Sequence, residues 1–152
     1  MILLLTKLEI KMGDDFIIAC QDGDIAAVMN LVSKGCNVNK TDKWGDTGIM
    51  RAIANKHTAV TEYLCTVPSI DYNIVKSSDL TVLHDACRFG VSETVMRAIV
   101  SKINTNNANK KDILGNSALD WAVKKNNIMA VSIIGQRRDI VMDTDNLIQT
   151  AR

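Results

Sequence analysis

The sequence predicts an all-α solenoid of about four helix-turn-helix repeats joined by β-hairpin-like fingers. Three observations support this fold class. A short motif centred on an alanine recurs four times, a hydroxyl residue stands at a fixed place before that alanine in three of the copies, and helix-spaced apolar residues follow each copy. Self-similarity with a period of roughly 20–50 residues is typical of stacked repeat architectures.

The repeat emerges when the chain is aligned on four alanines spaced 33, 34 and 36 residues apart, namely Ala19, Ala52, Ala86 and Ala122. A Thr or Ser five positions before the alanine can accept a backbone N–H and cap a helix start, as expected for Thr47, Thr81 and Ser117. The first copy is partial. These alignments predict repeats at about 13–41, 42–75, 76–109 and 110–136.

The first helix of each repeat is predicted to end four residues after its alanine, in the left-handed conformation common at helix ends. Gly23 and Gly90 suit that conformation, and Asn126 tolerates it. Lys56 holds the same place in the second copy, where it should cost about 1 kcal/mol. A second helix with apolar residues at i, i+3 and i+4 follows each time.

Two flanking segments fall outside the repeats. Residues 1–12 are expected to form an N-terminal extension, whose apolar run of five residues is too short for a signal-peptide core or a membrane span. Residues 137–152 are expected to form a C-terminal cap or the start of an incomplete fifth repeat. A short helix at residues 143–149 is compatible with either.

Composition narrows the classes of partner. Aromatic residues make up only 4% of the chain, so an aliphatic core is expected, and the net charge is +1. Neither half of the chain carries the positive excess that neutralising many phosphates requires. We therefore expect no nucleic acid as partner. Because no apolar run is long enough for a signal peptide or a membrane span, we also expect no membrane partner and a cytoplasmic or nuclear location. The protein is expected to be a monomer.

These residues resemble the ankyrin repeat, whose usual core is Thr-Pro-Leu-His-x-Ala with a period near 33. The third copy is the nearest match, with Thr81, Leu83, His84 and Ala86 in register. The resemblance covers roughly residues 13–136. No copy has the proline, because Gly48, Val82 and Ala118 stand there, and only His84 keeps the histidine. These departures favour a less stable array of the same fold.

The residues that suggest chemistry all have structural interpretations. The four cysteines form no C-x-x-C pair and fall on predicted core positions: Cys20, Cys36, Cys65 and Cys87. The two histidines, His57 and His84, fall on positions where the repeat often has histidine. A catalytic Cys87–His84 pair is the alternative, and it would need a cleft and an orienting group. We expect no catalytic, cofactor-binding or metal-binding residue, and no enzyme.

The resemblance implies a protein-interaction module, that is an adaptor, scaffold or inhibitor, which binds through finger tips and the concave face of the first helices. Its contact positions fall in the second copy on Lys43, Trp44, Asp46 and Asn55. In the third copy they fall on Ser77, Ser78, Leu80, Arg88 and Phe89, and in the fourth on Ile113, Leu114, Asn116, Lys124 and Lys125.

Large apolar residues at predicted finger tips, led by Trp44, and Phe89 on the groove side would form a binding strip, because Trp and Arg are frequent interface anchors. The alternative is that Trp44 and Leu114 pack against a neighbouring finger. A second functional reading is an accessory ankyrin domain, or a fragment of a larger enzyme or signalling protein, that positions a separate catalytic region.

Overall fold

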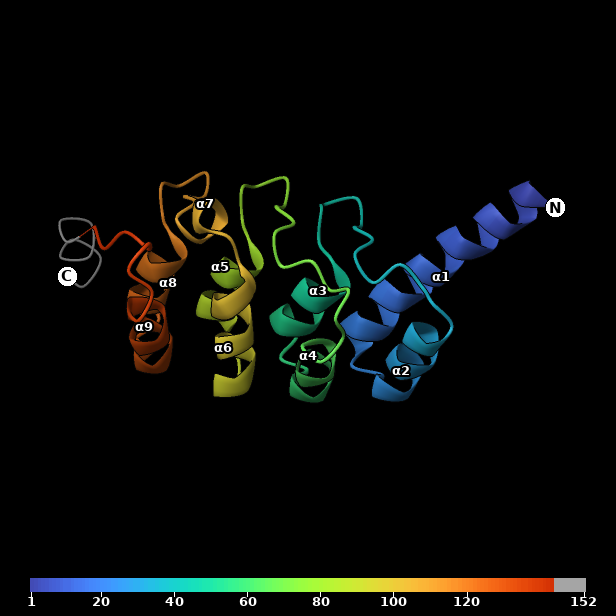
Figure 1. Ribbon diagram of the computed structural model, residues 1–152, viewed down its shortest axis with the longest axis horizontal. Helices are drawn as coiled ribbons and strands as arrows, with labels where there is room; N and C mark the ends of the chain where they lie inside the picture. The colour runs from blue at the N-terminus through green and yellow to red at the C-terminus, as the bar shows by residue number, and fades with distance from the viewer. Residues whose placement is uncertain (144–152) are drawn as a thin grey trace. The chain divides into compact units, whose positions relative to one another are not determined.

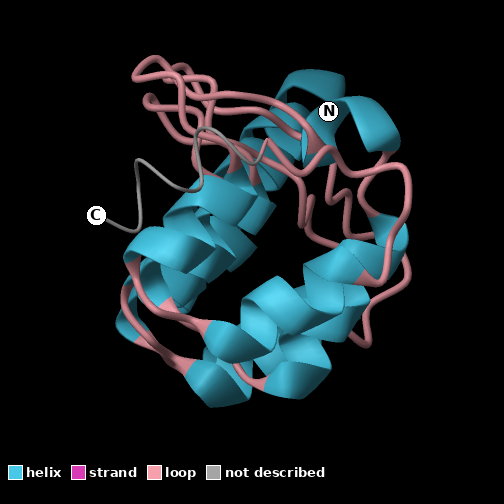
Figure 2. Ribbon diagram, turned by 90° about the vertical axis from the view of Figure 1, so that its left-hand side faces the viewer, coloured by secondary structure: helices cyan, strands magenta, loops and turns pink. Residues whose placement is uncertain are grey.

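The computed structural model of the chain describes residues 1–143, and every regular element among them is an α-helix (Figure 2). The chain divides into two compact units, Met1–Asp71 and Tyr72–Arg152. The helices of the first unit are α1 (Ile2–Asp22), α2 (Ile25–Ser33), α3 (Gly48–Ala54) and α4 (Thr58–Leu64). Those of the second are α5 (Val82–Phe89), α6 (Glu93–Lys102), α7 (Thr105–Ala108), α8 (Ala118–Lys124) and α9 (Ile128–Gly135) (Figure 1).

The first unit is two helix pairs packed together. The helix α1 packs against α2 and α3, and α4 packs against α3 and α2. Phe16 on α1 is fully buried, and a Cβ atom added at Gly48 would lie 2.5 Å from its ring. The ring therefore takes the space that a larger residue at position 48 would need, which explains a glycine where the repeat usually has proline.

The second unit repeats this arrangement. The helix α5 packs against α8, α6 packs against α9, and each pair is closed by its own partner helix. Its core is aliphatic, as the low aromatic content predicted, and Leu83, Met96, Ile99 and Ile134 are among its fully buried side chains. The short helix α7, which the sequence analysis did not predict, begins after Asn104, whose side chain accepts from the backbone N–H of Asn107.

The predicted hydroxyl caps form at two of three helix starts. Thr81 and Ser117 each accept from the backbone N–H three residues on, and the side chains of His84 and Asp120 bond back to complete a capping box. Thr47 occupies the same position before α3 but makes no such bond, and its buried hydroxyl has no hydrogen-bond partner. The residue three positions on is Met50, which has no polar group to return the bond.

The helix ends follow the prediction with one exception. Gly23 is left-handed, and Lys56 and Asn126 also have positive φ, at 60° and 53°. Gly90 has φ 82° but ψ 143°, so the prediction of a left-handed residue there was wrong in ψ. Because that region is open essentially only to glycine, the chain leaves α5 by a route that the other repeats do not use.

The helix α1 continues without a break from the predicted extension into the first repeat. Residues 1–11 are all exposed, and the first buried residue of the helix is Gly13. Its N-terminal turns lie away from the other helices of the unit (Figure 1). The Lys40 side chain lies against this boundary, with its Nζ 2.9 Å from the carbonyl oxygen of Ile10 and 2.6 Å from Asp14.

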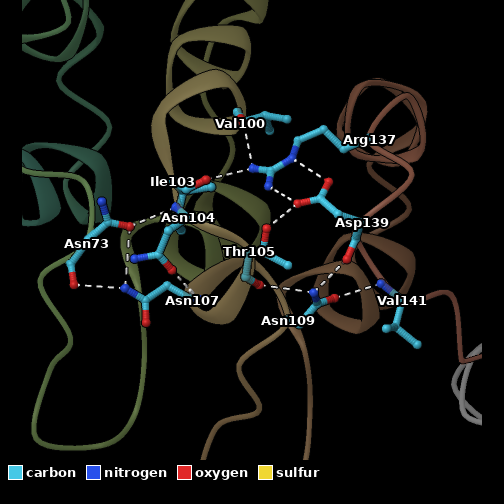
Figure 3. A network of polar contacts seen from close by, with 10 residues as sticks. All are labelled: Asn73, Val100, Ile103, Asn104, Thr105, Asn107, Asn109, Arg137, Asp139 and Val141. Atoms are coloured by element: carbon cyan, nitrogen blue, oxygen red, sulfur yellow. Dashed lines mark hydrogen bonds and ion pairs between the residues drawn. The ribbon is translucent and has the colours of Figure 1, made fainter.

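Asparagines tie consecutive connections together within each unit. Asn39 donates to the carbonyl of Ser69 and accepts from the N–H of Asp71. Asn109 repeats this pattern on residues 139 and 141, with distances of 2.8 and 2.7 Å (Figure 3). Asn73 accepts from the N–H of Asn104 at 2.8 Å. These bonds satisfy backbone groups that no sheet would otherwise pair.

Arg137 fixes the segment after α9 onto α6 and α7. Its guanidinium donates to the carbonyls of Val100 and Ile103, at 2.9 and 2.7 Å, and it pairs with Asp139 (Figure 3). Asp139 in turn accepts from the Thr105 hydroxyl. The described part of the predicted 137–152 segment, up to residue 143, is thus bonded to α6 and to the connection that precedes α8. The rest of that segment, with the helix expected at 143–149, lies outside the described residues beyond Asp143.

Candidate functional site

The 41–47 loop before α3 is built around Asp42. One carboxylate oxygen accepts from the backbone N–H groups of Trp44 and Asp46, at 2.9 and 3.0 Å, and the other accepts from Arg51 on α3, with 2.8 Å to Nε. Burial would raise the pKa of Asp42, but the Arg51 bond and the two backbone donors lower it below its usual value. A single antiparallel bridge between Thr41 and Thr47 closes the loop, and the described residues contain no strand there.

The 111–117 loop before α8 has the same design with a different partner. One oxygen of Asp112 accepts from the backbone N–H groups of Leu114 and Asn116, and the other accepts from the indole Nε1 of Trp121 at 2.8 Å. Burial raises the pKa of Asp112, and these hydrogen bonds more than reverse that effect and lower it. Trp121 thus replaces Arg51 as the helix residue that holds the loop.

In the 76–80 loop before α5, the charges of the Asp42–Arg51 pair are exchanged. Lys76 stands where the other loops have aspartate, and its Nζ lies 2.6 Å from the buried carboxylate of Asp85 on α5. The loop closes when the N–H of Lys76 donates to the carbonyl of Leu80. In all three loops the paired residues are nine apart, ten positions and one position before the key alanine. That shared spacing was a signal in the sequence, and the sequence analysis missed it.

The predicted contact residues of the first unit lie on and beside the 41–47 loop. Trp44 is 57% exposed, and the cations of Lys43 and Arg51 lie 4.2 and 4.9 Å from its ring centre. Asp46 is half-buried and paired with Arg51 at 3.2 Å. Asn55 is exposed at the end of α3 and donates its amide to the carbonyl of Arg51. Trp44 and Lys43 are therefore the groups most open to a partner.

The predicted loop residues of the second unit differ in exposure. Ile113 and Leu114 are 73% and 74% exposed at the tip of the 111–117 loop. Ser77 is exposed, but Ser78 and Leu80 are half-buried, so Leu80 is not the exposed tip residue that the sequence predicted. The 111–117 loop thus holds Ile113 and Leu114 out in water on a turn fixed by Asp112.

Asn116 was predicted to contact a partner, but its side chain is buried. Its Oδ1 accepts from Lys124 Nζ at 2.7 Å, and its carbonyl accepts from His84. Both groups are engaged within the unit, so Asn116 positions Lys124 and leaves little surface for a partner.

The helix face of the second unit gathers aromatic and cationic side chains. Arg88 and Phe89 are half-buried on α5, and the Arg88 guanidinium lies 5.2 Å from the Phe89 ring centre and 4.7 Å from that of Trp121. Lys124 lies 5.1 Å from the same Trp121 ring, and Lys125 is exposed at the end of α8. Trp121 was not predicted as a site residue, although it links this face to the 111–117 loop.

Three of the four thiols are buried, which disfavours their nucleophilic thiolate form, whereas Cys65 is half-buried and not the core residue that the sequence predicted. Cys20 and Cys87 are almost fully buried, and Cys36 is 9% exposed. Burial raises the pKa of Cys20 to about 12, with a smaller contribution from Cys36, and burial also raises the pKa of Cys36 and Cys87. Among residues 1–143, no group of three His, Cys, Asp or Glu side chains is placed to hold a metal ion.

Both histidines bond to the scaffold. His84 is fully buried, with its Nδ1 accepting from the backbone N–H of Thr81 and its Nε2 3.2 Å from the carbonyl of Asn116. This geometry places the proton on Nε2. His57 is the N-cap residue just before α4, and its Nε2 lies 2.8 Å from the carbonyl of Gln21 at the end of α1.

Comparison with known proteins identifies the family to which this repeat architecture belongs. Residues 16–95 match the family described as ankyrin repeats (3 copies). The chain belongs to the ankyrin-repeat family. Its all-α repeat fold, with first helices packed on first helices within each unit, is that of the family. Ankyrin repeats generally mediate protein–protein interaction and are typically not catalytic.

One curated relative of this ankyrin-repeat chain is the human SMC5-SMC6 complex localization factor protein 1. The two are 36% identical over 59 residues, which are 39% of this chain and 6% of the relative. The chain therefore matches only a small part of a much longer protein. In the part of the ankyrin-repeat chain that the structure describes, no helix has both the length and the apolar character needed to cross a bilayer.

Proposed function

We propose that the chain is a protein-interaction module, acting as an adaptor, scaffold or inhibitor, that binds a partner protein through its loop tips and the adjoining face of the first helices. The observation that carries this proposal is the exposure of Trp44, Ile113 and Leu114 on rigid loops. Large apolar side chains are normally buried. When they are exposed on a turn that is already fixed, less conformational entropy is lost on binding a partner.

The rigidity of the loops supports the proposal. Asp42 and Asp112 each hold two backbone N–H groups and one side chain of the following helix, so the loops are ordered before any partner arrives. Trp44 meets a partner with its ring already flanked by Lys43 and Arg51. Tryptophan buried at the centre of an interface is a frequent energetic hot spot.

We propose that Phe89 contributes less to partner contact than the sequence suggested. It is half-buried and shares the Arg88 guanidinium with Trp121. We propose that Trp44, Ile113 and Leu114 supply the apolar contacts. Beside Trp44 in the first unit, the polar contacts come from Lys43, Asp46 and Asn55. Beside Ile113 and Leu114 in the second unit, they come from Ser77, Ser78, Lys124 and Lys125.

Other features of the proposal rest on charge and composition. The near-zero net charge favours a protein partner over nucleic acid. We propose a monomer that works in the cytoplasm or nucleus without catalysis. The localization role in the relative's name is compatible with a module that brings proteins together.

The experiment compares proteins captured from cell extract by the wild-type chain and by two variants. Trp44→Ala and the double change Ile113→Ala with Leu114→Ala should each lose the same specific partner. Ile128→Ala is the matched control, because Ile128 is 74% exposed on α9 and belongs to neither loop. All chains should keep the same helicity. A partner retained equally by all four proteins would place the binding surface elsewhere.

A second candidate is an accessory role, in which the repeats position a catalytic region of a larger protein. It is favoured by the relative, in which the matching segment is 6% of the length. An antibody raised against residues 42–75 should then detect a protein much larger than 16.7 kDa in the source cell. Detection only at the mass of this chain would reject that candidate.

A further inference from the structure

We propose that the second unit recognises an acidic peptide segment, with Arg88 receiving a carboxylate of that segment. This inference rests on the proposed protein-binding function and specifies the chemistry of the partner. It starts from one side chain, because Arg88 is a half-buried cation whose hydrogen-bonding groups remain unused.

The Arg88 guanidinium is held by stacking and not by hydrogen bonds. Its central carbon lies 4.7 Å from the Trp121 ring centre, and it makes no hydrogen bond or ion pair with any residue in the described range 1–143. Stacking on an aromatic face fixes the plane of a guanidinium and leaves its in-plane N–H donors free. A preoriented fork of this kind matches a carboxylate, which it can bind through two parallel hydrogen bonds.

The orientation of Trp121 is itself fixed. Its Nε1 donates to Asp112, and Lys124 lies over the same ring. Lys124 is in turn held by Asn116. Arg88 is therefore the last member of a chain of contacts that begins in the 111–117 loop, and little ordering remains for a partner to induce.

The exposed charge of this face is positive. The carboxylates carried by α5 and α8, Asp85 and Asp120, are buried, and they are engaged by Lys76 and by the N–H of Ser117. The Arg88, Lys124 and Lys125 cations remain at the surface. No carboxylate of these two helices competes for Arg88. The positive electrostatic potential there is not neutralised, and it should attract an acidic ligand.

The first unit lacks this property, which makes the inference specific to the second. Arg51 stands one position before the key alanine, as Trp121 does, but it is paired with both Asp42 and Asp46. That face is electrically balanced. An acidic segment should therefore prefer the second unit.

The neighbouring loop adds an apolar requirement. The other oxygen of Asp112 holds the turn that displays Ile113 and Leu114, so these exposed side chains are joined to Trp121 through a single aspartate. The segment that fits this face carries Glu or Asp together with a bulky aliphatic residue. A nucleic acid strand would instead need a longer row of cations for its phosphates.

The test follows the two indole N–H resonances and the Arg88 Nε–H resonance of the full isotope-labelled chain by NMR. The probe is the peptide acetyl-Glu-Leu-Glu-Glu-Leu-Glu-amide, and its neutral counterpart has Gln in place of every Glu. The acidic peptide should shift the Trp121 and Arg88 resonances with a Kd of about 1 mM or tighter. The neutral peptide should bind at least about tenfold more weakly, because it cannot form charge-assisted bonds.

Two variants separate the site from general electrostatics. Arg88→Gln should weaken binding of the acidic peptide at least about tenfold. Arg97→Gln removes an exposed arginine from α6, where it pairs with Glu93, and should leave binding unchanged. If both variants weakened peptide binding equally, the net charge of the chain would explain the affinity, and the inference would be overturned.

Three further outcomes would also overturn it. The neutral peptide could bind as tightly as the acidic one, an oligothymidine strand could saturate the same resonances more tightly, or no resonance of Arg88 could move. A peptide that shifts only the Trp44 indole would reject the Arg88 site but leave the proposed binding function standing. The two proposals can therefore fail separately.

Discussion

Thr47 and Thr81 occupy the same position in consecutive repeats and differ in one measurable respect. The Thr81 hydroxyl accepts from the N–H of His84 and lies 2.9 Å from its ring nitrogen, whereas the buried Thr47 hydroxyl has no partner. Replacing each threonine by valine keeps the shape and removes the hydroxyl. We predict that only the change at Thr81 lowers the free energy of unfolding.

The magnitudes follow from the contacts. Thr81→Val removes an N-terminal cap and leaves the fully buried N–H of His84 without an acceptor, which should cost about 1–2 kcal/mol. Thr47→Val breaks no hydrogen bond and spares the burial of an unsatisfied hydroxyl, so it should be neutral or stabilise by up to about 1 kcal/mol. The two variants should differ by about 2 kcal/mol, or roughly thirtyfold in the local unfolding equilibrium.

Native-state amide hydrogen exchange measures this locally, because repeat proteins can open one part at a time. The slowest amides of α3 report on Thr47→Val and those of α5 on Thr81→Val, each against the wild type. Urea unfolding followed by circular dichroism gives the global value. A loss of 1 kcal/mol or more for Thr47→Val, or equal effects of the two variants, would refute the role assigned to the cap.

Three more predictions concern single side chains. Lys56→Gly should raise the unfolding free energy by about 0.5–1 kcal/mol, measured by urea unfolding, because glycine removes the strain of φ 60°. Burial lowers the pKa of His84, so the unfolded chain takes up its proton first. Stability should therefore fall as pH drops through about 6.5, and His84→Gln should lack that part of the loss in a pH series of urea midpoints. Arg137→Ala should cost about 1.5–3 kcal/mol by losing its bonds to Val100 and Ile103, whereas Arg138→Ala, on an exposed neighbour, should change stability by less than about 0.5 kcal/mol in the same assay.

The features that could be predicted from the sequence are those set by local backbone chemistry. Threonine and serine mark helix starts, and residues such as Gly23, Lys56 and Asn126 mark helix ends at a fixed distance from the key alanine. Position alone did not reveal that Thr47 lacks its bond, because Thr47 stands in the same register as Thr81 and Ser117, which form theirs. Nor did it give ψ at Gly90, because glycine permits several positive-φ conformations.

Exposure at the candidate site was harder to predict than position. Ile113, Leu114 and Trp44 are exposed as expected, but Leu80 is half-buried and Asn116 is buried. A loop residue's exposure depends on which neighbouring side chain folds over it, and that is a tertiary contact. Trp121 was overlooked because its hydrogen bond to Asp112, nine residues earlier, was not predicted.

The nine-residue pairing also has a consequence for engineering and for exchange between repeats. The first position holds Asp42, Lys76 and Asp112, and the second holds Arg51, Asp85 and Trp121. Choosing the residue at each position separately could lose this agreement. A loop transplanted without its helix would set lysine against arginine, or aspartate against aspartate. The loop residue and the helix residue of each pair depend on one another, and a consensus version of this protein must copy them as pairs.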